Sequence, residues 1–407
     1  MGHGLFPHAR AAKHFIRIEL MTKSQRFFIV FLSVLACGLL GTVFYYGAQN
    51  YEFWAKQPLG PGLSNVTPWI LPATWTASPT NSGSLPRVAR PVSTLIVAPS
   101  TNTPSPITRC GGPPVMNLLA VGSDYRGDGY LYGLGDVIRI VRVDFITPKV
   151  TVLEFPRDLW VQIPDIADNL KGQDHEKLNQ AYLYGNKGFG YTDDPAQGPG
   201  LLARTLALNF GVKLDHYVAV NMHTFVNIVD AVGGIDVNLP DGLDGREGKD
   251  QSARLVFPKG EQHLDGEQAL TIARMRNEGV FQRADNQNLI LCALRQKLAN
   301  PDVIQHFPDL ISSFKNSIQT DLTPEQIGQL ACLGPQIPAG NIIFASFPQE
   351  LFTGTRVYDP VFGKRVFIWD VDFSVLRSYV AQFQAGSWPV PFFGQTTQNQ
   401  DAPIKCQ

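Results

Sequence analysis

The sequence predicts an α/β sandwich that follows one transmembrane helix and a disordered linker. Strand-like and helix-like stretches alternate along residues 115–300, which is typical of a sheet covered by helices. An uncharged apolar run precedes them at residues 27–48, and a proline-rich segment lies between. The chain has 407 residues, 44% of them hydrophobic, which is enough for a sizeable core. Its net charge of −1 gives no indication of nucleic-acid binding.

The apolar run predicts a membrane anchor. It holds 22 residues without a charge, and none follows until Glu52. A helix of this length spans roughly 33 Å, the thickness of a bilayer core. A cleavable signal peptide would have a shorter apolar region ending in an A-x-A-like site, which we do not find. A buried core helix is not expected beside a linker.

Basic residues before this run predict its orientation: Arg10, Lys13, Arg17, Lys23 and Arg26. By the positive-inside rule, residues 1–26 are cytoplasmic and the C-terminal head is extracytoplasmic, which makes a single-pass protein of the cell membrane. Aromatic residues that suit the outer interface follow the run, namely Tyr45, Tyr46, Tyr51 and Trp54. Residues 1–20 resemble neither a helix nor a signal, so Met21 is a candidate start.

Residues 49–114 are expected to form a linker rich in proline, serine and threonine. Between Pro58 and Arg109 there are ten prolines and no acidic residue. Such a stretch cannot bury enough apolar surface to fold. We expect an extended tether that reaches between roughly 40 Å as a coil and 150 Å when stretched, and that lifts the head off the membrane.

The head is expected to begin near Val115. Residues 136–145 and 150–155 are predicted strands joined by a Thr-Pro-Lys turn, and so form a hairpin. The other predicted strands are residues 116–122, 216–220 and 235–239. The predicted helices are residues 177–184, 200–209, 223–232 and 284–299, together with a helix that opens at Asp265 and carries Arg274. Residues 301–385 continue with helices and two strand-like runs, and are expected to pack on the head ahead of a tail at residues 386–407.

Two N-terminal signatures support the helix starts. Asp265 and Gln268 form a capping box that opens the helix carrying Arg274. Thr323 and Pro324, followed by a glutamine, begin another helix.

Four of the five cysteines lie outside the predicted anchor, which fits an oxidising exterior and allows three pairings. No two have C-x-x-C spacing, which argues against zinc. Cys292 and Cys332 fall in helices that follow one another closely, so we predict a bond between them. Closing this loop of about 40 residues should stabilise by roughly 3–4 kcal/mol. The companion pair is Cys110 with Cys406, both at the edges of the head.

The stretch ARMRNEGVFQR holds three arginines, Arg274, Arg276 and Arg283. Residues two apart on a helix point to different faces, so the first two can meet one ligand only if the helix ends between or beside them. The Asn-Glu-Gly that follows Arg276 favours a stop there.

Further charged and polar residues lie at the ends of predicted strands or near a helix start: Asp124, Arg126, Asp136, Arg157, Asp158, Lys177 and Asn179. Each alone is more often a surface charge or a structural ion pair. Ligands bind at strand ends in open α/β sheets, so together they form a candidate site.

Six stretches resemble, in order, the motifs of the LytR-CpsA-Psr family: NLLAVGSDYR, VTVLEFPRDLWVQIP, EKLNQAY, HYVAVNMHTFVNIVDAVGGIDVNLP, FPKGEQHLDGEQALTIARMR and FQRADNQ. The resemblance covers about residues 115–299, and six ordered motifs are more specific than any one of them. It implies an αβα sandwich with a mixed central sheet and a groove for a lipid tail. A cytoplasmic N-terminus, an anchor and an exported head are also the layout of this family.

The resemblance implies a phosphotransferase that moves a glycopolymer from a polyprenyl-pyrophosphate carrier to a hydroxyl of peptidoglycan. Such a reaction depends on positioning and on neutralising the charge that builds on the phosphates, and arginine forks suit phosphate oxygens. By similarity the pyrophosphate is held by Arg157, Lys177, Arg274, Arg276, Arg283 and Gln287. Mg²⁺, which takes one or two carboxylates plus substrate phosphates, would be held by Asp124 and Asp136.

The catalytic residues implied are Asp124, Asp136, Arg157, Arg274 and Arg276, with Arg126, Asp158 and Asn179 in support. One of the two metal-binding aspartates could also accept the proton of the acceptor hydroxyl, and the sequence leaves open which.

Two positions depart from the family pattern. Leu134 and Asn286 stand where the family often has arginine. Two alternatives therefore stay open: a non-catalytic scaffold or sensor that binds polyprenyl lipids, and a polyprenyl-pyrophosphate phosphatase that uses water as acceptor. A serine hydrolase is poorly supported, because G-x-S-x-G is absent and Ser123 has no identifiable base. H-E-x-x-H and Walker A patterns are absent as well.

Overall fold

The computed structural model describes residues 22–64, 107–127, 130, 132–246, 252–275, 280–300, 314, 317–389 and 404–406. The chain divides into two units, one up to Gln57 and one from Pro58 onward, and each is described by itself.

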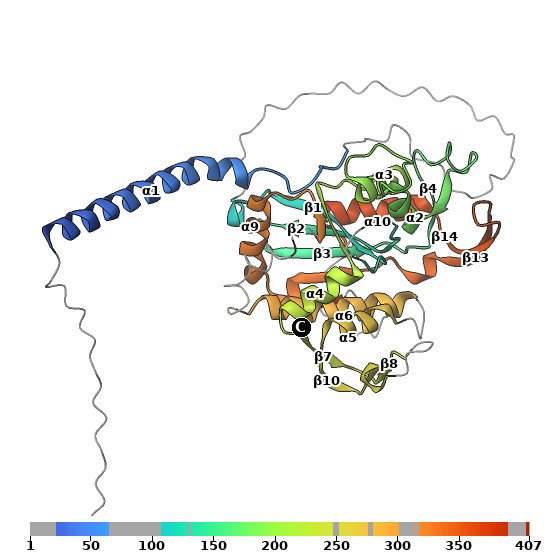
Figure 1. The fold of residues 1–407 in the computed structure, drawn as a ribbon. Helices are drawn as coiled ribbons and strands as arrows, with labels where there is room; N and C mark the ends of the chain where they lie inside the picture. The colour runs from blue at the N-terminus through green and yellow to red at the C-terminus, as the bar shows by residue number, and fades with distance from the viewer. Residues whose placement is uncertain are drawn as a thin grey trace, which may run out of the picture. The chain divides into compact units, whose positions relative to one another are not determined.

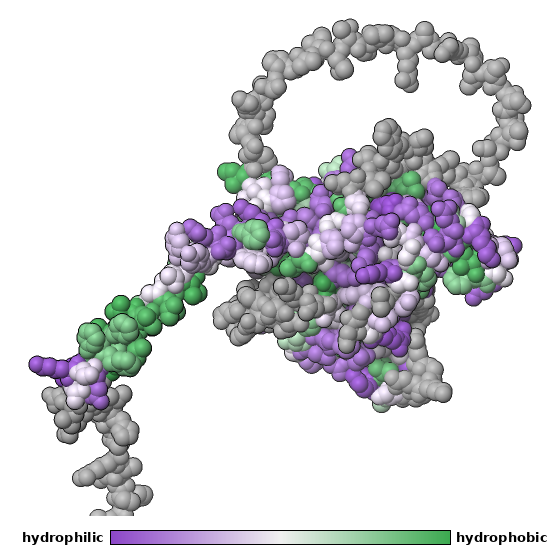
Figure 2. Space-filling view, turned by 45° about the horizontal axis from the view of Figure 1, so that its top comes forward, coloured by the Kyte–Doolittle hydropathy of each residue, from purple (hydrophilic) through white to green (hydrophobic). Residues whose placement is uncertain are grey.

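The first unit contains one long helix, α1 (Lys23–Ala55). A capping box between Thr22 and Gln25 opens it, and none of its residues is buried. Figure 2 shows a continuous hydrophobic surface along it. By length and composition α1 can cross a membrane, as expected for the anchor, and it extends beyond the apolar run at both ends.

The second unit is built around a seven-stranded mixed sheet (Figure 1). In spatial order its strands are β11 (Ile318–Thr320), β6 (His216–Asn221), β1 (Val115–Ser123), β2 (Gly135–Asp144), β3 (Lys149–Glu154), β12 (Ile342–Ala345) and β15 (Ile404–Lys405). The β1–β6 and β3–β12 pairs are parallel and the others antiparallel. The predicted mixed sheet and the β2–β3 hairpin are confirmed.

Helices cover both faces of the sheet because side chains alternate along each strand. Leu119 and Val121 of β1 enter one core with α2 (Leu178–Gly185), α3 (Gln197–Phe210) and α10 (Phe373–Ala385). Met116 and Leu118 point to the other face, toward α9 (Pro324–Leu333). The protein is therefore an αβα sandwich, as the sequence predicts.

A third core lies under the sheet in Figure 1. It joins α4 (Met222–Ala231), α5 (Gly266–Arg274) and α6 (Val280–Leu298) to the pair β7 (Ile235–Leu239) and β10 (Gly260–Leu264). Three small two-stranded sheets complete the unit as described: β4 (Trp160–Gln162) with β5 (His175–Lys177), β8 (Leu243–Asp244) with β9 (Val256–Phe257), and β13 (Thr353–Asp359) with β14 (Lys364–Asp370). The capping boxes expected at Asp265 and Thr323 are both present.

The segment after α1 departs from the expected tether, because its first residues already contact the head. The amide of Leu59 donates to the Leu322 carbonyl at 3.1 Å, and the Tyr217 hydroxyl donates to the Pro61 carbonyl at 3.1 Å. A Cβ on Gly60 would come within 2.6 Å of the Thr320 carbonyl, so only glycine fits there. Residues 65–106, which lie outside the described residues, thus connect two points of the same unit.

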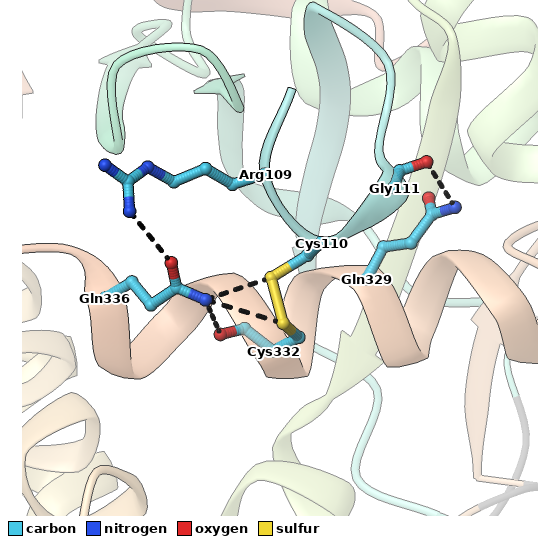
Figure 3. The surroundings of a disulfide bond; sticks show 6 residues. All are labelled: Arg109, Cys110, Gly111, Gln329, Cys332 and Gln336. Carbon is cyan, nitrogen blue, oxygen red and sulfur yellow. Dashed lines mark hydrogen bonds between the residues drawn. A yellow bond between two sulfur atoms is a disulfide. The ribbon is translucent and has the colours of Figure 1, made fainter. Parts of the chain in front are cut away.

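Both predicted disulfides are wrong. The bonds join Cys110 to Cys332 and Cys292 to Cys406, with Cα–Cα distances of 5.9 and 5.3 Å. Cys332 faces the start of the head, where the short helix Arg109–Gly111 runs against α9 (Figure 3).

Side-chain hydrogen bonds support the first disulfide: Gln329 donates to the Gly111 carbonyl and Arg109 to Gln336. Cys406 follows β15, whose pairing with β12 brings it to Cys292 on α6. Helix α9 follows α6 along the chain, but their cysteines do not meet. The cysteine of each helix is bonded to a cysteine at one end of the head instead.

Candidate functional site

An apolar cavity of about 220 Å³ lies between the sheet and the helices α4, α5 and α6. Its apolar wall includes Val121, Val137, Val218, Val220, Phe225, Leu270, Ile290 and Leu291. Polar side chains also line it: Asp136, Arg139, Arg274, Arg283 and Gln287. A pocket with this lining suits an apolar chain that carries an anionic group.

A larger cavity, about 810 Å³, lies along β7, β10 and α6. Its described lining contains Asp236, Glu261 and Asp285 but no lysine or arginine. An anionic ligand would be repelled there, so we place the candidate site in the smaller cavity.

Asp136 is the centre of the charged site. Its side chain forms ion pairs with the guanidinium groups of Arg157 and Arg283, the latter at 3.5 Å. Asn179 donates to the same carboxylate at 3.4 Å. The elements that carry these three residues place them at one end of the sheet. Asp136 opens β2, Arg157 follows β3, and Arg283 lies near the start of α6.

Asp158 links the site to a further cation. Its two carboxylate oxygens bind Arg157 Nε at 3.4 Å and Lys177 Nζ at 2.7 Å. The charges thus alternate along a series, Lys177, Asp158, Arg157, Asp136 and Arg283. Burial alone would lower the pKa of Arg157, but the charges of Asp136 and Asp158 outweigh it and raise that pKa.

Asp124 lies beside this series, in the loop that follows β1. Its carboxylate accepts a hydrogen bond from the Leu134 amide at 2.7 Å. Burial raises the pKa of Asp124, and the charge of Asp136 adds to the rise, while the Leu134 hydrogen bond and Arg157 oppose it. Two carboxylates with hard oxygen atoms therefore share one electrostatic environment.

The end of α5 bears on whether Arg274 and Arg276 can meet one ligand. Helix α5 ends at Arg274, and Met275 already has an extended backbone, so the helix stops between the two arginines as required. Arg274 lines the cavity. Arg276 lies outside the described residues.

Arg139 is a site residue that the sequence analysis missed. It is only 2% exposed, and its guanidinium binds Glu154 at 2.7 Å, Asn288 at 2.8 Å and Gln287 at 3.0 Å. The Gln287 amide nitrogen donates to the Ala273 carbonyl. Gln287, expected to bind phosphate, therefore already holds Arg139 and the end of α5. The sequence signal for Arg139 was its charge inside the alternating strand DVIRIVRV.

The comparisons with known proteins agree with this geometry. Residues 111–366 match the LytR_cpsA_psr family. The chain belongs to this family.

Relatives of this LytR_cpsA_psr protein have informative names. It is 31% identical over 218 residues to the polyisoprenyl-teichoic acid–peptidoglycan teichoic acid transferase TagU of Oceanobacillus iheyensis, covering 53% of this chain and 61% of that protein. It is 31% identical over 211 residues to the transferase of the same description, TagV, of Bacillus subtilis, covering 51% and 50%. The chain thus spans about half to three fifths of these curated relatives.

The crystal structure of B. subtilis TagV aligns with a TM-score of 0.50 at 24% identity, covering 67% of this chain and 97% of that one. This supports the fold assigned to this LytR_cpsA_psr protein.

Two positions distinguish this LytR_cpsA_psr protein from the expected pattern. Leu134 contributes its backbone instead of a charge, since its amide fixes Asp124. Asn286 lies one turn after Arg283 on α6, and its buried Nδ2 has no hydrogen-bond partner among the described residues. The expected supporting residue Arg126 is exposed in the loop after β1.

Proposed function

We propose that this protein is a membrane-anchored, extracytoplasmic phosphotransferase. It moves a glycopolymer from a polyprenyl-pyrophosphate carrier to a hydroxyl of peptidoglycan and releases polyprenyl phosphate. The names of the TagU and TagV relatives, which act on polyisoprenyl-linked teichoic acid and peptidoglycan, support this assignment.

One observation carries the proposal: an apolar cavity has arginines in its lining. Val137, Phe225 and Leu291 offer a surface for an isoprenoid chain, while Arg274 and Arg283 line the same cavity. A polyprenyl pyrophosphate matches this lining, because it has an apolar tail and an anionic head. Fork-shaped donors bind phosphate oxygens, and charge-assisted hydrogen bonds of this kind contribute roughly 1.5–3 kcal/mol each.

The charge series explains how the arginines are prepared for the donor. Without ligand, Asp136 and Asp158 hold Arg157 in place, so little side-chain entropy is lost when a phosphate binds. Phosphate oxygens then compete with these carboxylates for the same guanidinium. Arg157, Arg274, Arg283 and Lys177 neutralise the charge that builds on the phosphates as the bond to the leaving polyprenyl phosphate breaks.

We assign proton acceptance from the acceptor hydroxyl to Asp124. Its pKa is raised by burial and by Asp136, which makes it a better base than an ordinary aspartate. Arg157 pairs directly with Asp136, so that carboxylate already has a cationic partner.

Asp124 and Asp136 also fit a magnesium ion. Two neighbouring carboxylates repel each other, and this repulsion is relieved by a cation that takes hard oxygen ligands. No group of three or more His, Cys, Asp or Glu side chains suited to a metal occurs in the described part of the chain, so substrate phosphates would have to complete the coordination of such an ion. When bound, the ion would supply positive charge to the phosphates.

The orientation of α1 is part of the proposal. The basic residues before it favour a cytoplasmic N-terminus and an extracytoplasmic head. A periplasm- or surface-active reporter fused after Gln407 should be active, and a cytoplasmically active fusion would contradict the proposed location.

Transfer itself tests the function. Purified protein in detergent is mixed with a polyprenyl-pyrophosphate-linked teichoic acid and with peptidoglycan, and both the polymer bound to peptidoglycan and the released polyprenyl phosphate are measured. The proposal predicts that the two rise together. Release without attachment would assign a phosphatase, and tight lipid binding without either product would assign a carrier-binding scaffold, the alternative that Leu134 and Asn286 motivate.

A further inference from the structure

The β13–β14 hairpin has two chemically different faces. Its register places Gly354 opposite Trp369, Arg356 opposite Phe367, and Tyr358 opposite Arg365. Directly opposite residues share a face, so these six form one surface, which we name the aromatic–arginine face. The other face holds Asp359 and Ile368, which are buried against the head.

Aromatic rings line much of this face. Gly354 has no side chain, and a Cβ there would lie 2.9 Å from the Phe367 ring and 3.5 Å from that of Trp369, so both rings lie over the glycine. Phe367 packs edge-on against Trp369 with 5.0 Å between the ring centroids. Tyr358 continues the surface and is 62% exposed. Phe367 is exposed as well, whereas Trp369 is half-buried and packs against the core of the head. The exposed rings of Tyr358 and Phe367 offer apolar surfaces to sugar rings.

Cations are interleaved with the rings. Arg356 and Arg365 are both exposed, and the Arg365 guanidinium donates to the Arg356 carbonyl across the two strands. The face contains no acidic residue, since Asp359 and Asp370 belong to the other face. A ligand that fits it therefore has sugar rings and negative charges.

The hairpin is fixed beside the charged site. The Trp369 amide donates to the Asp158 carbonyl at 3.0 Å, and Leu159 forms a bridge with Trp369. Asp158 also binds Arg157, and Arg157 binds Asp136 in the cavity lining. This series of contacts places Arg157 between Asp136 in the cavity lining and Asp158, whose carbonyl binds the hairpin.

The place of the hairpin relative to the cavity indicates which glycan it binds, the polymer of the lipid-linked donor or the peptidoglycan acceptor. In phosphoryl transfer the attacking and leaving oxygens lie roughly in line on opposite sides of the phosphorus. The leaving polyprenyl phosphate is on the cavity side, so the attacking hydroxyl approaches from the side of the hairpin. The face is thus placed for the acceptor.

We propose that the aromatic–arginine face binds the acceptor, a peptidoglycan strand whose sugars stack on the rings and whose carboxylates pair with Arg356 and Arg365. The inference rests on the proposed function, because it assigns the acceptor subsite of that reaction. At the end of the head where Figure 1 labels β13, Figure 2 shows hydrophobic atoms enclosed by hydrophilic ones.

A lipid surface is the competing occupant. The hairpin turn exposes Val361 and Phe362, with Lys364 over the Phe362 ring. Insertion into a bilayer would depend on this apolar turn, whereas binding of a glycan would depend on the aromatic–arginine face. The two occupants thus require different residues.

The experiment measures sedimentation of the full-length protein, in detergent, with purified insoluble peptidoglycan sacculi freed of attached polymers. Arg365→Ala and Tyr358→Ala should each weaken binding about tenfold, as expected for losing one charge-assisted or ring contact. Lys364→Ala is the matched control, because it removes an exposed charge from the other face of the same strand. Phe362→Ala tests the turn. Both should bind like the parent chain.

A second measurement separates this inference from the proposed function. Arg365→Ala and Tyr358→Ala should raise the KM for peptidoglycan while the KM for the lipid-linked donor is unchanged. Sacculus binding needs no donor, so it is measurable even if the parent chain transfers nothing, an outcome that would overturn the proposed function alone.

Melting temperatures confirm that the variants are folded, and Arg356→Ala replaces any that is not. Unchanged sacculus binding in the face variants would overturn the inference. So would a loss of sacculus binding in Phe362→Ala as large as in the face variants, because contact would then depend on the apolar turn.

Discussion

Arg157 and Asp136 form an ion pair at the lining of an apolar cavity, although one follows strand β3 and the other opens strand β2. The antiparallel pairing of β2 and β3 brings the two positions to the same end of the sheet. Arg283 reaches the same carboxylate from α6. A charged site is thus assembled from three segments, and the proposed chemistry depends on it.

Arg157→Ala should lower transfer roughly thirtyfold, because losing one arginine–phosphate contact costs about 2 kcal/mol. Arg204→Ala is a matched control. Arg204 is also paired with aspartate and its side chain has the same 18% exposure, but its partner is Asp165, which does not line the cavity as Asp136 does. Initial rates with a lipid-linked donor measure both. Equal effects of the two substitutions would contradict a role for Arg157 in binding phosphate.

Asp124→Ala should reduce transfer tenfold or more, on the order expected for loss of a metal ligand or a general base. A chelator should lower the parent activity, and added Mg²⁺ should restore it. Asp241→Ala removes an exposed carboxylate whose lysine partner is also exposed, and should change neither rate nor magnesium response. Full activity in the presence of chelator would rule out the magnesium proposal.

Glu176 should make stability depend on pH. Burial and the neighbouring Asp359 raise its pKa to about 8 in the folded protein. An unfolded glutamate titrates near its ordinary value, about 4.3, so the folded state holds the extra proton between the two values. Stability from this group is therefore fully present below the lower value and is lost as the pH rises through the upper one.

Glu176→Gln cannot ionise and should remove this dependence. The expected gain over the parent chain at about pH 8.5 is on the order of 5 kcal/mol, since the two pKa values differ by nearly four units and one unit corresponds to about 1.4 kcal/mol. Urea unfolding at about pH 5 and pH 8.5 measures it. Parallel pH profiles for the two proteins would show that Glu176 is not buried as a neutral acid.

The disulfides should stabilise the head strongly. Replacing Cys292 and Cys406 by serine should cost on the order of 5 kcal/mol in the chain-entropy model, because the bond closes a separation of 114 residues. Cys37→Ser is the control, since Cys37 is an exposed free thiol in α1. Non-reducing peptide mapping should recover Cys110 with Cys332 and Cys292 with Cys406. A peptide linking Cys292 to Cys332 would overturn this pairing.

The sequence predicted the helices and strands better than the tertiary contacts between them. Alternation and capping residues are local, so the β2–β3 hairpin and the capping box at Asp265 could be found without knowing the fold. The charged ends of β1, β2 and β3 converge because adjacent strands share an edge, which a sequence analysis can anticipate.

Contacts between residues far apart in the sequence could not be predicted from such local patterns. The disulfides depend on where the two ends of the head return, and Arg139 is buried because Glu154, Gln287 and Asn288 surround it. The docking of Leu59 on Leu322 is not visible in a proline-rich composition. Each is set by tertiary contacts between segments far apart in the sequence.

The central claim is that the arginines hold a pyrophosphate whose isoprenoid tail fills the apolar cavity. A crystal structure of the protein purified from its own cells, or with added polyprenyl pyrophosphate, tests it most directly. The account predicts phosphate density in contact with Arg157 and Arg283 and a lipid tail along Val137, Phe225 and Leu291. A lipid bound in the cavity lined by Asp236 and Glu261, with Arg157 still paired only to its aspartates, would contradict it.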